Sequence, residues 1–321
     1  SFNEKNKEYD FELRYYKGHL NKHNVILTQG VDAVCIFVND TADAEVLRMM
    51  ADNGVKLLAL RCAGYNNVDL KAAAECGITV VRVPAYSPYA VAEYTVALML
   101  SLNRKIPRAT WRTRDGNFSL HGLLGFDMYG KTAGIIGTGK IAKKLIMILR
   151  GFGMNILAYD LYPDYNFARE HQVVYTTLDE LYHSSDIISL HCPLTEQTKY
   201  LINDYSISKM KDGVMIINTG RGQLIHTNAL IEGLKNKKIG SAGLDVYEEE
   251  SEYFYEDQSD RIIDDDVLAR LLSFNNVIVT SHQAFFTREA LENIATTTLQ
   301  NIKDFKSGKV SENEVNANIR L

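Results

Sequence analysis

The stretch Lys131-Thr-Ala-Gly-Ile-Ile-Gly-Thr-Gly-Lys-Ile-Ala142 decides the fold of this chain. Its apolar first half is typical of a buried strand, and the Gly137-x-Gly139-x-x-Ala142 turn leads into an apolar helical segment that ends near Gly151. A second strand, Asn155-Ile-Leu-Ala-Tyr-Asp160, follows and ends in a carboxylate. This strand–turn–helix–strand unit is typical of doubly wound α/β domains, which bind phosphate groups at the helix N-terminus.

Each residue type in this unit suits a dinucleotide. Gly137 allows the tight turn, and Gly139 lets the backbone approach a pyrophosphate. Ala142 replaces the third glycine of the usual pattern but still permits close packing of helix and strand. Asp160 lies 18 residues after Ala142, where a carboxylate binds the ribose hydroxyls of NAD and repels the 2′-phosphate of NADP. The alternative is a structural glycine turn with a solvated Asp160, but the agreement of strand, helix and acid favours NAD.

Composition excludes several other classes of protein. The chain has 321 residues, 46% of them hydrophobic and 23% charged, which is enough for two globular domains. A net charge of −5 offers no basic surface, so we expect no nucleic-acid partner. The four cysteines show no zinc spacing, so we expect free thiols, no metal site and a cytoplasmic location. No apolar run is long enough to span a bilayer, so we expect no membrane partner.

Strand-like runs alternate with helical patterns along the chain, which predicts parallel sheets. Pro84 and Pro88 precede a long predicted helix over 90–108, and we place a domain crossing there. Residues 1–10 are polar and supply no first strand, which leaves open whether further residues precede Ser1 in the natural protein. The predicted strands cover 33–38, 55–60, 78–83, 132–137, 155–160, 173–175, 186–191, 213–218, 239–244 and 276–280, and further helices cover 43–53, 69–76 and 288–305.

The predicted fold class is α/β, with two doubly wound parallel-sheet domains. A Rossmann-type NAD domain over 87–284 is inserted into a flavodoxin-like substrate domain, which comprises 1–86 and a returning part over 285–321. Residues 245–266 are rich in Asp and Glu, and we interpret most of these carboxylates as parts of a solvated loop.

Two residues that follow predicted strands carry chemistry suited to a small organic acid. Arg221 follows the strand over 213–218, and its planar guanidinium matches a carboxylate. His282 follows the strand over 276–280, and histidine is the natural acid–base group near neutral pH. A surface arginine and a structural histidine remain the alternatives. Glu250 lies 32 residues before His282, so spacing cannot show that the two side chains pair.

Several ordered motifs occur over nearly the whole chain. They are Arg61-Cys-Ala-Gly-Tyr-Asn-Asn-Val-Asp69, Arg82-Val-Pro-Ala-Tyr-Ser-Pro88, Gly134-Ile-Ile-Gly-Thr-Gly139, His191-Cys-Pro-Leu-Thr195, Asn218-Thr-Gly-Arg-Gly222, Leu244-Asp-Val-Tyr-Glu248 and Ser281-His-Gln-Ala-Phe285. In these motifs the chain resembles the D-2-hydroxyacid dehydrogenase family. Within it the chain is most similar to the fermentative D-lactate dehydrogenases, which implies NADH-dependent, reversible reduction of pyruvate to D-lactate.

The resemblance implies a catalytic trio. Arg221 binds the substrate carboxylate, His282 is the acid and base, and Glu250 keeps His282 protonated and oriented. Glu250 is chosen over its acidic neighbours because the family's acid stands five residues after the Asp of the Leu-Asp-Val-Tyr motif, here Asp245.

The resemblance also implies the binding residues. For the substrate they are the backbone N–H groups of Ala63 and Gly64, the side chain of Tyr86, and Phe285, which crowds the substrate side chain and favours small acids. Asp245 is expected to contact the nicotinamide amide. The remaining cofactor contacts are expected at Gly137, Gly139, Lys140, Ile141, Asp160, His191, Cys192, Pro193 and Thr219.

Two alternative functions remain. One is a dehydrogenase for a bulkier D-2-hydroxy acid of the 2-hydroxyisocaproate type, because the acidic insertion over 248–266 resembles both branches. The other is an NAD-sensing binding protein like the family's transcriptional corepressors, which can retain the catalytic trio. The insertion and the lack of extra tails argue against the corepressor. The family resemblance further implies a homodimer or homotetramer.

Overall fold

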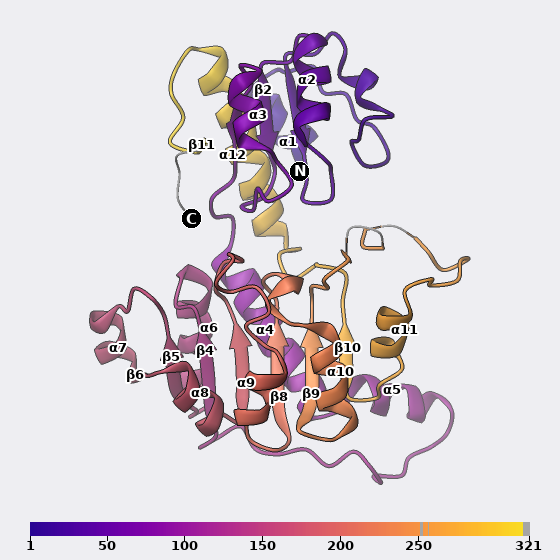
Figure 1. Cartoon of the computed structure of the whole chain (residues 1–321), viewed down its shortest axis with the longest axis vertical. Helices are drawn as coiled ribbons and strands as arrows, with labels where there is room; N and C mark the ends of the chain where they lie inside the picture. The colour runs from indigo at the N-terminus through magenta and orange to yellow at the C-terminus, as the bar shows by residue number, and fades with distance from the viewer. Residues whose placement is uncertain (251–252, 256, 317–321) are drawn as a thin grey trace. The chain divides into compact units, whose positions relative to one another are not determined.

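The computed structural model describes residues 1–250, 253–255 and 257–316. Two compact units make up the chain (Figure 1). Unit 1 consists of Ser1–Ser87 and Phe286–Leu321, and unit 2 consists of Pro88–Phe285. The glycine-rich turn of the sequence lies in unit 2, which interrupts unit 1 in the chain.

Unit 2 is built on a seven-stranded sheet of order β10-β9-β8-β7-β4-β5-β6, in which every neighbouring pair is parallel. The strand order reverses between β4 and β7, which is the switch point where doubly wound sheets bind ligands. The strands are β4 (Thr132–Ile136), β5 (Asn155–Tyr159), β6 (Val173–Tyr175), β7 (Ile187–Leu190), β8 (Val214–Asn218), β9 (Ile239–Leu244) and β10 (Val277–Val279).

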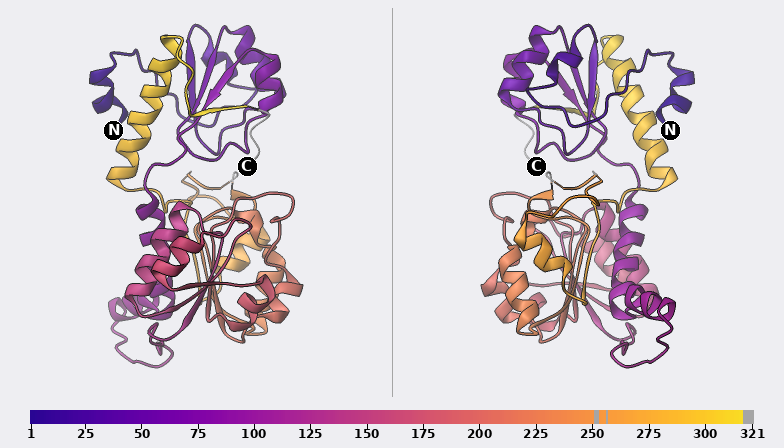
Figure 2. Two further views of the ribbon diagram at one scale, coloured as in Figure 1. Left: turned by 90° about the vertical axis from the view of Figure 1, so that its left-hand side faces the viewer. Right: turned by 90° about the vertical axis from the view of Figure 1, so that its right-hand side faces the viewer.

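Helices cover both faces of this sheet (Figure 2), because its central strands are apolar on both sides. On one face α4 (Pro88–Asn103) and α6 (Lys140–Gly151) contribute Met99, Leu145 and Leu149 to a buried cluster. The helices that pack on the other face are α8 (Leu178–Ser184), α9 (Asp204–Lys209), α10 (Thr227–Lys235) and α11 (Asp266–Leu272). A short α7 (Tyr165–His171) precedes β6. None of the described helices combines the length and apolar character needed to cross a membrane.

The long helix predicted over 90–108 is wrong, because the chain breaks there into two helices. Helix α4 ends at Asn103, and α5 (Ile106–Arg114) begins after Lys105, whose backbone is left-handed with a φ of 52°. Pro107 explains the break. A proline has no N–H to bond back into a continuing helix, and its ring would clash with the carbonyl four residues earlier, whereas it is tolerated in the first turn of a new helix.

Unit 1 contains a four-stranded sheet of order β1-β2-β3-β11. The strands β1 (Ala33–Ile36), β2 (Leu57–Leu60) and β3 (Thr79–Val81) are parallel, and the short β11 (Glu314–Val315) runs antiparallel to β3. Side chains of α12 (Arg288–Lys306) pack on this sheet. The remaining helices are α1 (Phe2–Lys5), α2 (Ala44–Asp52) and α3 (Leu70–Glu75).

β1 is an edge strand of unit 1, and a cavity of about 680 Å³ lies beside it. Residues 10–18 and 30–36 line the cavity together with part of α12. β2 is buried throughout, but Cys35 of β1 is exposed. As expected from the polar first residues, no strand precedes β1, and residues 2–8 are helical.

Candidate active site

Three adjacent strands of unit 2 bring the predicted catalytic residues to one edge of the sheet. Their carboxyl ends are joined by backbone hydrogen bonds, because the Asp245 N–H donates to the Asn218 carbonyl (2.9 Å) and the His282 N–H donates to the Asp245 carbonyl (2.7 Å). Arg221 follows β8, Glu250 follows β9 and His282 follows β10. The sheet order β10-β9-β8 therefore places these segments side by side.

Glu250 and His282 form a pair that spacing could not show. Oε1 of Glu250 lies 2.9 Å from Nδ1 of His282, and the side chains are only 22% and 14% exposed. A carboxylate can only accept, so Nδ1 carries a proton and Nε2 remains for proton transfer. The other oxygen, Oε2, accepts a hydrogen bond from the Tyr247 N–H (3.2 Å), which fixes the carboxylate.

Asp245 holds the turn that carries His282. Its buried Oδ1 accepts hydrogen bonds from the Thr280 hydroxyl (2.6 Å) and the Gln283 N–H (2.9 Å), and Oδ2 accepts one from the Ala284 N–H (2.8 Å). Burial raises the pKa of Asp245, although these donors and the nearby His282 oppose the rise. The expected contact of Asp245 to the nicotinamide amide stays a prediction. Thr280 could not be identified as a site residue from the sequence, because it appears there only as the end of a strand.

Arg221 lies on a turn whose shape is set by neighbouring residues of the motif over 218–222. The Asn218 side chain donates to the Arg221 carbonyl (2.8 Å) and accepts from the Gly220 N–H (3.0 Å). A Cβ on Gly222 would stand 2.0 Å from the Tyr247 carbonyl oxygen, so only glycine fits there. This close approach brings the arginine turn against the segment that leads to Glu250. The half-buried Arg221 guanidinium donates to the Gly220 carbonyl (2.8 Å).

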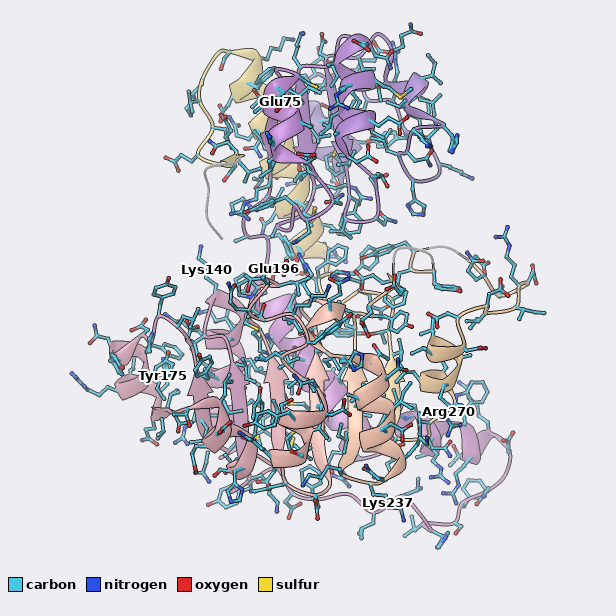
Figure 3. The ribbon with its side chains drawn as sticks, in the orientation of Figure 1. Glu75, Lys140, Tyr175, Glu196, Lys237 and Arg270 are labelled. Atoms are coloured by element: carbon cyan, nitrogen blue, oxygen red, sulfur yellow. The ribbon has the colours of Figure 1, made fainter. Side chains whose placement is uncertain are left out.

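The glycine turn and the first residues of α6 form a cradle that fits a pyrophosphate. Gly137 has a φ of 88°, and a Cβ there would stand 2.5 Å from the Cys192 backbone nitrogen. Gly139 is exposed, and a Cβ there would meet no atom within 4 Å, which leaves room for a ligand against the backbone. Lys140 projects at this edge of unit 2, whereas Lys237 marks the opposite edge (Figure 3). The N-terminus of the 12-residue α6 favours a negative charge here.

Asp160 closes the other side of this cradle. Its Oδ2 accepts hydrogen bonds from the N–H (2.5 Å) and hydroxyl (2.9 Å) of Thr138, and Oδ1 accepts one from the Tyr162 N–H (2.8 Å). Burial opposes ionisation, but these hydrogen bonds outweigh it and lower the pKa of Asp160. Thr138 was not among the site residues predicted from the sequence, although it stands between the two glycines of the fingerprint.

The other predicted cofactor residues surround the ends of β7, β8 and α6. Nε2 of His191 lies 2.8 Å from the Ser189 hydroxyl, and burial lowers the pKa of His191 to about 4. Burial raises the pKa of Cys192 to about 11, so its thiol stays protonated. The hydroxyl of the buried Thr219 lies 3.0 Å from that of Thr95 in α4.

Two further cofactor candidates differ in exposure. Pro193 is exposed and its carbonyl accepts a hydrogen bond from Thr198 (2.7 Å). Ile141 is half-buried against the core under α6. Within the described residues, no three His, Cys, Asp or Glu side chains gather as metal ligands would.

The predicted substrate residues divide between the two units. Ala63, Gly64 and Tyr86 belong to unit 1, and Phe285 is buried at the end of unit 2. The carbonyls of Ala63 and Tyr86 accept hydrogen bonds from Arg82 (2.9 Å) and Asn293 (2.6 Å). Among the described residues, the N–H groups of Ala63 and Gly64 have no acceptor, as a site for a carboxylate requires. The substrate roles of these four residues stay predictions.

Most of the described carboxylates in residues 245–266 are exposed, as expected for a solvated loop, but several have hydrogen-bond partners. Besides Glu250, Glu248 accepts a hydrogen bond from the Thr227 N–H (2.8 Å) at the start of α10. Asp265 caps α11 and accepts a hydrogen bond from the Tyr247 hydroxyl (2.6 Å). Glu249, Asp260 and Asp264 are exposed as expected. Charge-rich composition cannot separate these cases, because the partners are distant in the sequence.

Known proteins share sequence and fold with this chain. Residues 96–284 match the family model described as the NAD binding domain of D-isomer specific 2-hydroxyacid dehydrogenases. A D-lactate dehydrogenase of Escherichia coli is 53% identical over 310 residues, which cover 97% of this chain and 94% of that protein. The apo-structure of D-lactate dehydrogenase from Escherichia coli has a TM-score of 0.89 at 51% identity, covering 98% of this chain and 95% of that one.

A second solved structure is a D-lactate dehydrogenase from Aquifex aeolicus complexed with NAD and lactic acid. It has a TM-score of 0.87 at 35% identity and covers 98% of this chain and 95% of that one. The family model covers more than half of the chain and includes the glycine cradle and the three strand ends. The chain therefore belongs to the D-isomer specific 2-hydroxyacid dehydrogenases and is an NAD-dependent oxidoreductase.

Proposed function

We propose that this protein is a D-lactate dehydrogenase that reduces pyruvate with NADH and runs reversibly. The observation that carries the proposal is the half-buried Glu250–His282 pair at 2.9 Å, on the strand edge that also bears Arg221. Such a pair supplies a proton donor, and the arginine supplies a cation for the substrate carboxylate. The two relatives described above, named D-lactate dehydrogenases, support this substrate over other 2-oxo acids.

In this proposal each residue of the trio has one task. The Arg221 guanidinium binds the carboxylate of the 2-oxo acid in its planar fork. His282 donates the proton on Nε2 to the alkoxide that develops on the carbonyl oxygen, and it accepts that proton in the reverse reaction. Glu250 accepts the Nδ1 proton, which sets the orientation of the ring and favours the protonated imidazole.

The cofactor is assigned to the cradle formed by Gly137, Gly139 and Asp160. When bound there, NADH supplies the hydride for the carbonyl carbon. The exposed backbone at Gly139 and the start of α6 hold the pyrophosphate, and Asp160 accepts hydrogen bonds from the ribose hydroxyls. Asp245 fixes the histidine turn next to this site through its three hydrogen bonds.

A substrate panel tests the proposal. The purified chain is assayed by loss of NADH with pyruvate, with a longer straight-chain 2-oxo acid and with the branched 2-oxo acid that corresponds to 2-hydroxyisocaproate. We expect pyruvate to give the highest kcat/KM and the product to be D-lactate. A preference for the branched acid would replace the proposal by the hydroxyisocaproate type. NADH binding without turnover of any 2-oxo acid would instead indicate an NAD-sensing binding protein.

We also propose a homodimer or homotetramer in a reducing, cytoplasmic compartment. The arm formed by α5 and residues 115–130 exposes large apolar side chains, as surfaces that bind another copy do. These are Trp111, Phe118, Leu120, Leu124 and Tyr129. Four free cysteines support the compartment. Light scattering of the wild-type chain and of a Leu120→Glu, Leu124→Glu variant tests the oligomer, and an unchanged mass would argue against this arm.

A further inference from the structure

The backbone of His282 adopts a conformation that a non-glycine residue rarely holds without support. Its φ is 51°, in the left-handed region. Left-handed backbone is unfavourable for an L-residue and persists where the surroundings impose it. The His282 N–H is held by the Asp245 carbonyl (2.7 Å).

The peptide group between His282 and Gln283 is held by hydrogen bonds at both its N–H and its carbonyl. Its N–H, which belongs to Gln283, donates to Oδ1 of Asp245 (2.9 Å). Its carbonyl, which belongs to His282, accepts a hydrogen bond from the Tyr255 hydroxyl (3.1 Å). In a trans peptide the C=O and N–H point in opposite directions, so Asp245 and Tyr255 hold the plane from opposite sides. Rotation of this plane about its flanking bonds would break both hydrogen bonds.

Tyr255 reaches His282 from the same segment that carries Glu250. The Glu250 carbonyl accepts hydrogen bonds from the Tyr253 N–H (3.2 Å) and the Phe254 N–H (2.8 Å), and Phe254 is only 7% exposed. Tyr255 follows this buried anchor with a φ of 71°, and its ring lies 6.2 Å from the imidazole at an angle of 31°. The segment therefore contacts His282 twice, through the Glu250 carboxylate at the ring and through the Tyr255 hydroxyl at the backbone.

We propose that Tyr255 is a positioning residue for the acid–base histidine. Its hydroxyl locks the backbone of His282, so that Nδ1 stays at the Glu250 carboxylate and Nε2 stays aimed at the substrate. The inference rests on the proposed dehydrogenase reaction, because it assigns Tyr255 an effect on proton transfer through His282. The sequence does not identify Tyr255 as a positioning residue, because it is one tyrosine in an acid-rich run. Its contact with His282 depends on a turn 27 residues away.

The variant Tyr255→Phe tests this role, because it removes only the hydroxyl. We expect kcat for pyruvate reduction to fall about fivefold, as for the loss of one hydrogen bond. The KM for NADH should stay unchanged, because the glycine cradle is untouched. The matched control is Tyr253→Phe, which removes a hydroxyl from the same segment and should alter kcat by less than about twofold. Thermal unfolding and circular dichroism of both variants show whether they fold as the wild type does.

A double-mutant cycle with Glu250→Gln separates positioning from general loss of stability. If Tyr255 acts through the Glu250–His282 pair, Tyr255→Phe should cause no further loss of kcat in the Glu250→Gln background. An equal fivefold loss in both backgrounds, or an unchanged kcat in the single variant, would overturn the role of Tyr255 while the dehydrogenase function stands. A wild-type chain that reduces no 2-oxo acid would overturn both, and that result is seen before any variant is made.

Discussion

Oε1 of Glu250 lies 2.9 Å from Nδ1 of His282, although 32 residues separate them in the chain. The pair forms because β9 and β10 are neighbours in the sheet, so the segments that follow them leave from the same edge. In the proposed reaction, this relationship orients His282 as the acid–base group.

The first prediction concerns the pair itself. His282→Ala should lose nearly all turnover of pyruvate, at least about a hundredfold in kcat, because it removes the proton donor. Glu250→Gln should lose about tenfold or more, because a neutral amide favours the protonated imidazole less. NADH binding, measured by fluorescence titration, should change less than twofold in both variants. Near-normal turnover of His282→Ala would refute the assigned roles.

The second prediction compares two glycines of the fingerprint. Gly137→Ala should destabilise the fold by several kcal/mol, about 3 or more, because the new Cβ would press on the Cys192 backbone at 2.5 Å and φ is 88°. Gly139→Ala should leave the thermal unfolding temperature nearly unchanged, because its Cβ meets no protein atom. It should nevertheless weaken NADH binding at least tenfold, because the methyl group occupies space assigned to the pyrophosphate. If Gly137→Ala and Gly139→Ala lowered both stability and NADH binding to the same extent, the cradle would be only a structural turn.

The third prediction concerns the choice of cofactor. Asp160→Ala should lower the preference for NADH over NADPH, because it removes the carboxylate that binds the ribose hydroxyls of NADH and repels the 2′-phosphate of NADPH. We expect the ratio of kcat/KM values to fall about tenfold or more, mostly through a higher KM for NADH. The exposed Asp204→Ala serves as a control of equal charge change. An unchanged ratio would mean that Asp160 only supports Thr138 and does not face the ribose.

The fourth prediction is a pH dependence of stability that comes from His191. Burial lowers the pKa of His191 from its usual 6.5 to about 4. Between these pH values the unfolded chain binds a proton at His191 that the folded chain does not bind. The contribution of neutral His191 to the free energy of unfolding is therefore complete above pH 6.5 and is lost as the pH falls toward 4. The loss amounts to about 3 kcal/mol at most.

Urea unfolding at a series of pH values measures the contribution of His191 to the free energy of unfolding. His191→Gln should show a shallower fall in the free energy of unfolding below pH 6.5 than the wild type. The same change at the exposed His183 should leave the slope as it is. Parallel curves for the wild type and His191→Gln would show that His191 takes up protons equally in both states.

Local sequence was sufficient for most of the sheet in unit 2 and for the cradle. Apolar runs bounded by turn residues predicted the seven strands, because a parallel strand with both faces buried must be apolar along its length. The glycines at 137 and 139 could be identified because their backbone roles depend on residues next to them in the chain. The predicted helix over 90–108 failed at Pro107, where a local signal was present but was outweighed by the apolar pattern.

The contacts among the site residues could not be predicted in the same way. The sequence by itself determined the α/β class, the dinucleotide fingerprint, and the placement of Arg221 and His282 after strands. The tertiary structure shows the Glu250–His282 pair, which only the family resemblance had implied. It alone shows that Asp245 binds the Gln283 and Ala284 amides and that Tyr255 holds the His282 carbonyl. The physical reason is that these contacts join segments 27 to 39 residues apart. Their meeting depends on which strands are neighbours in the sheet, and the hydrophobic pattern of a single strand does not contain that order.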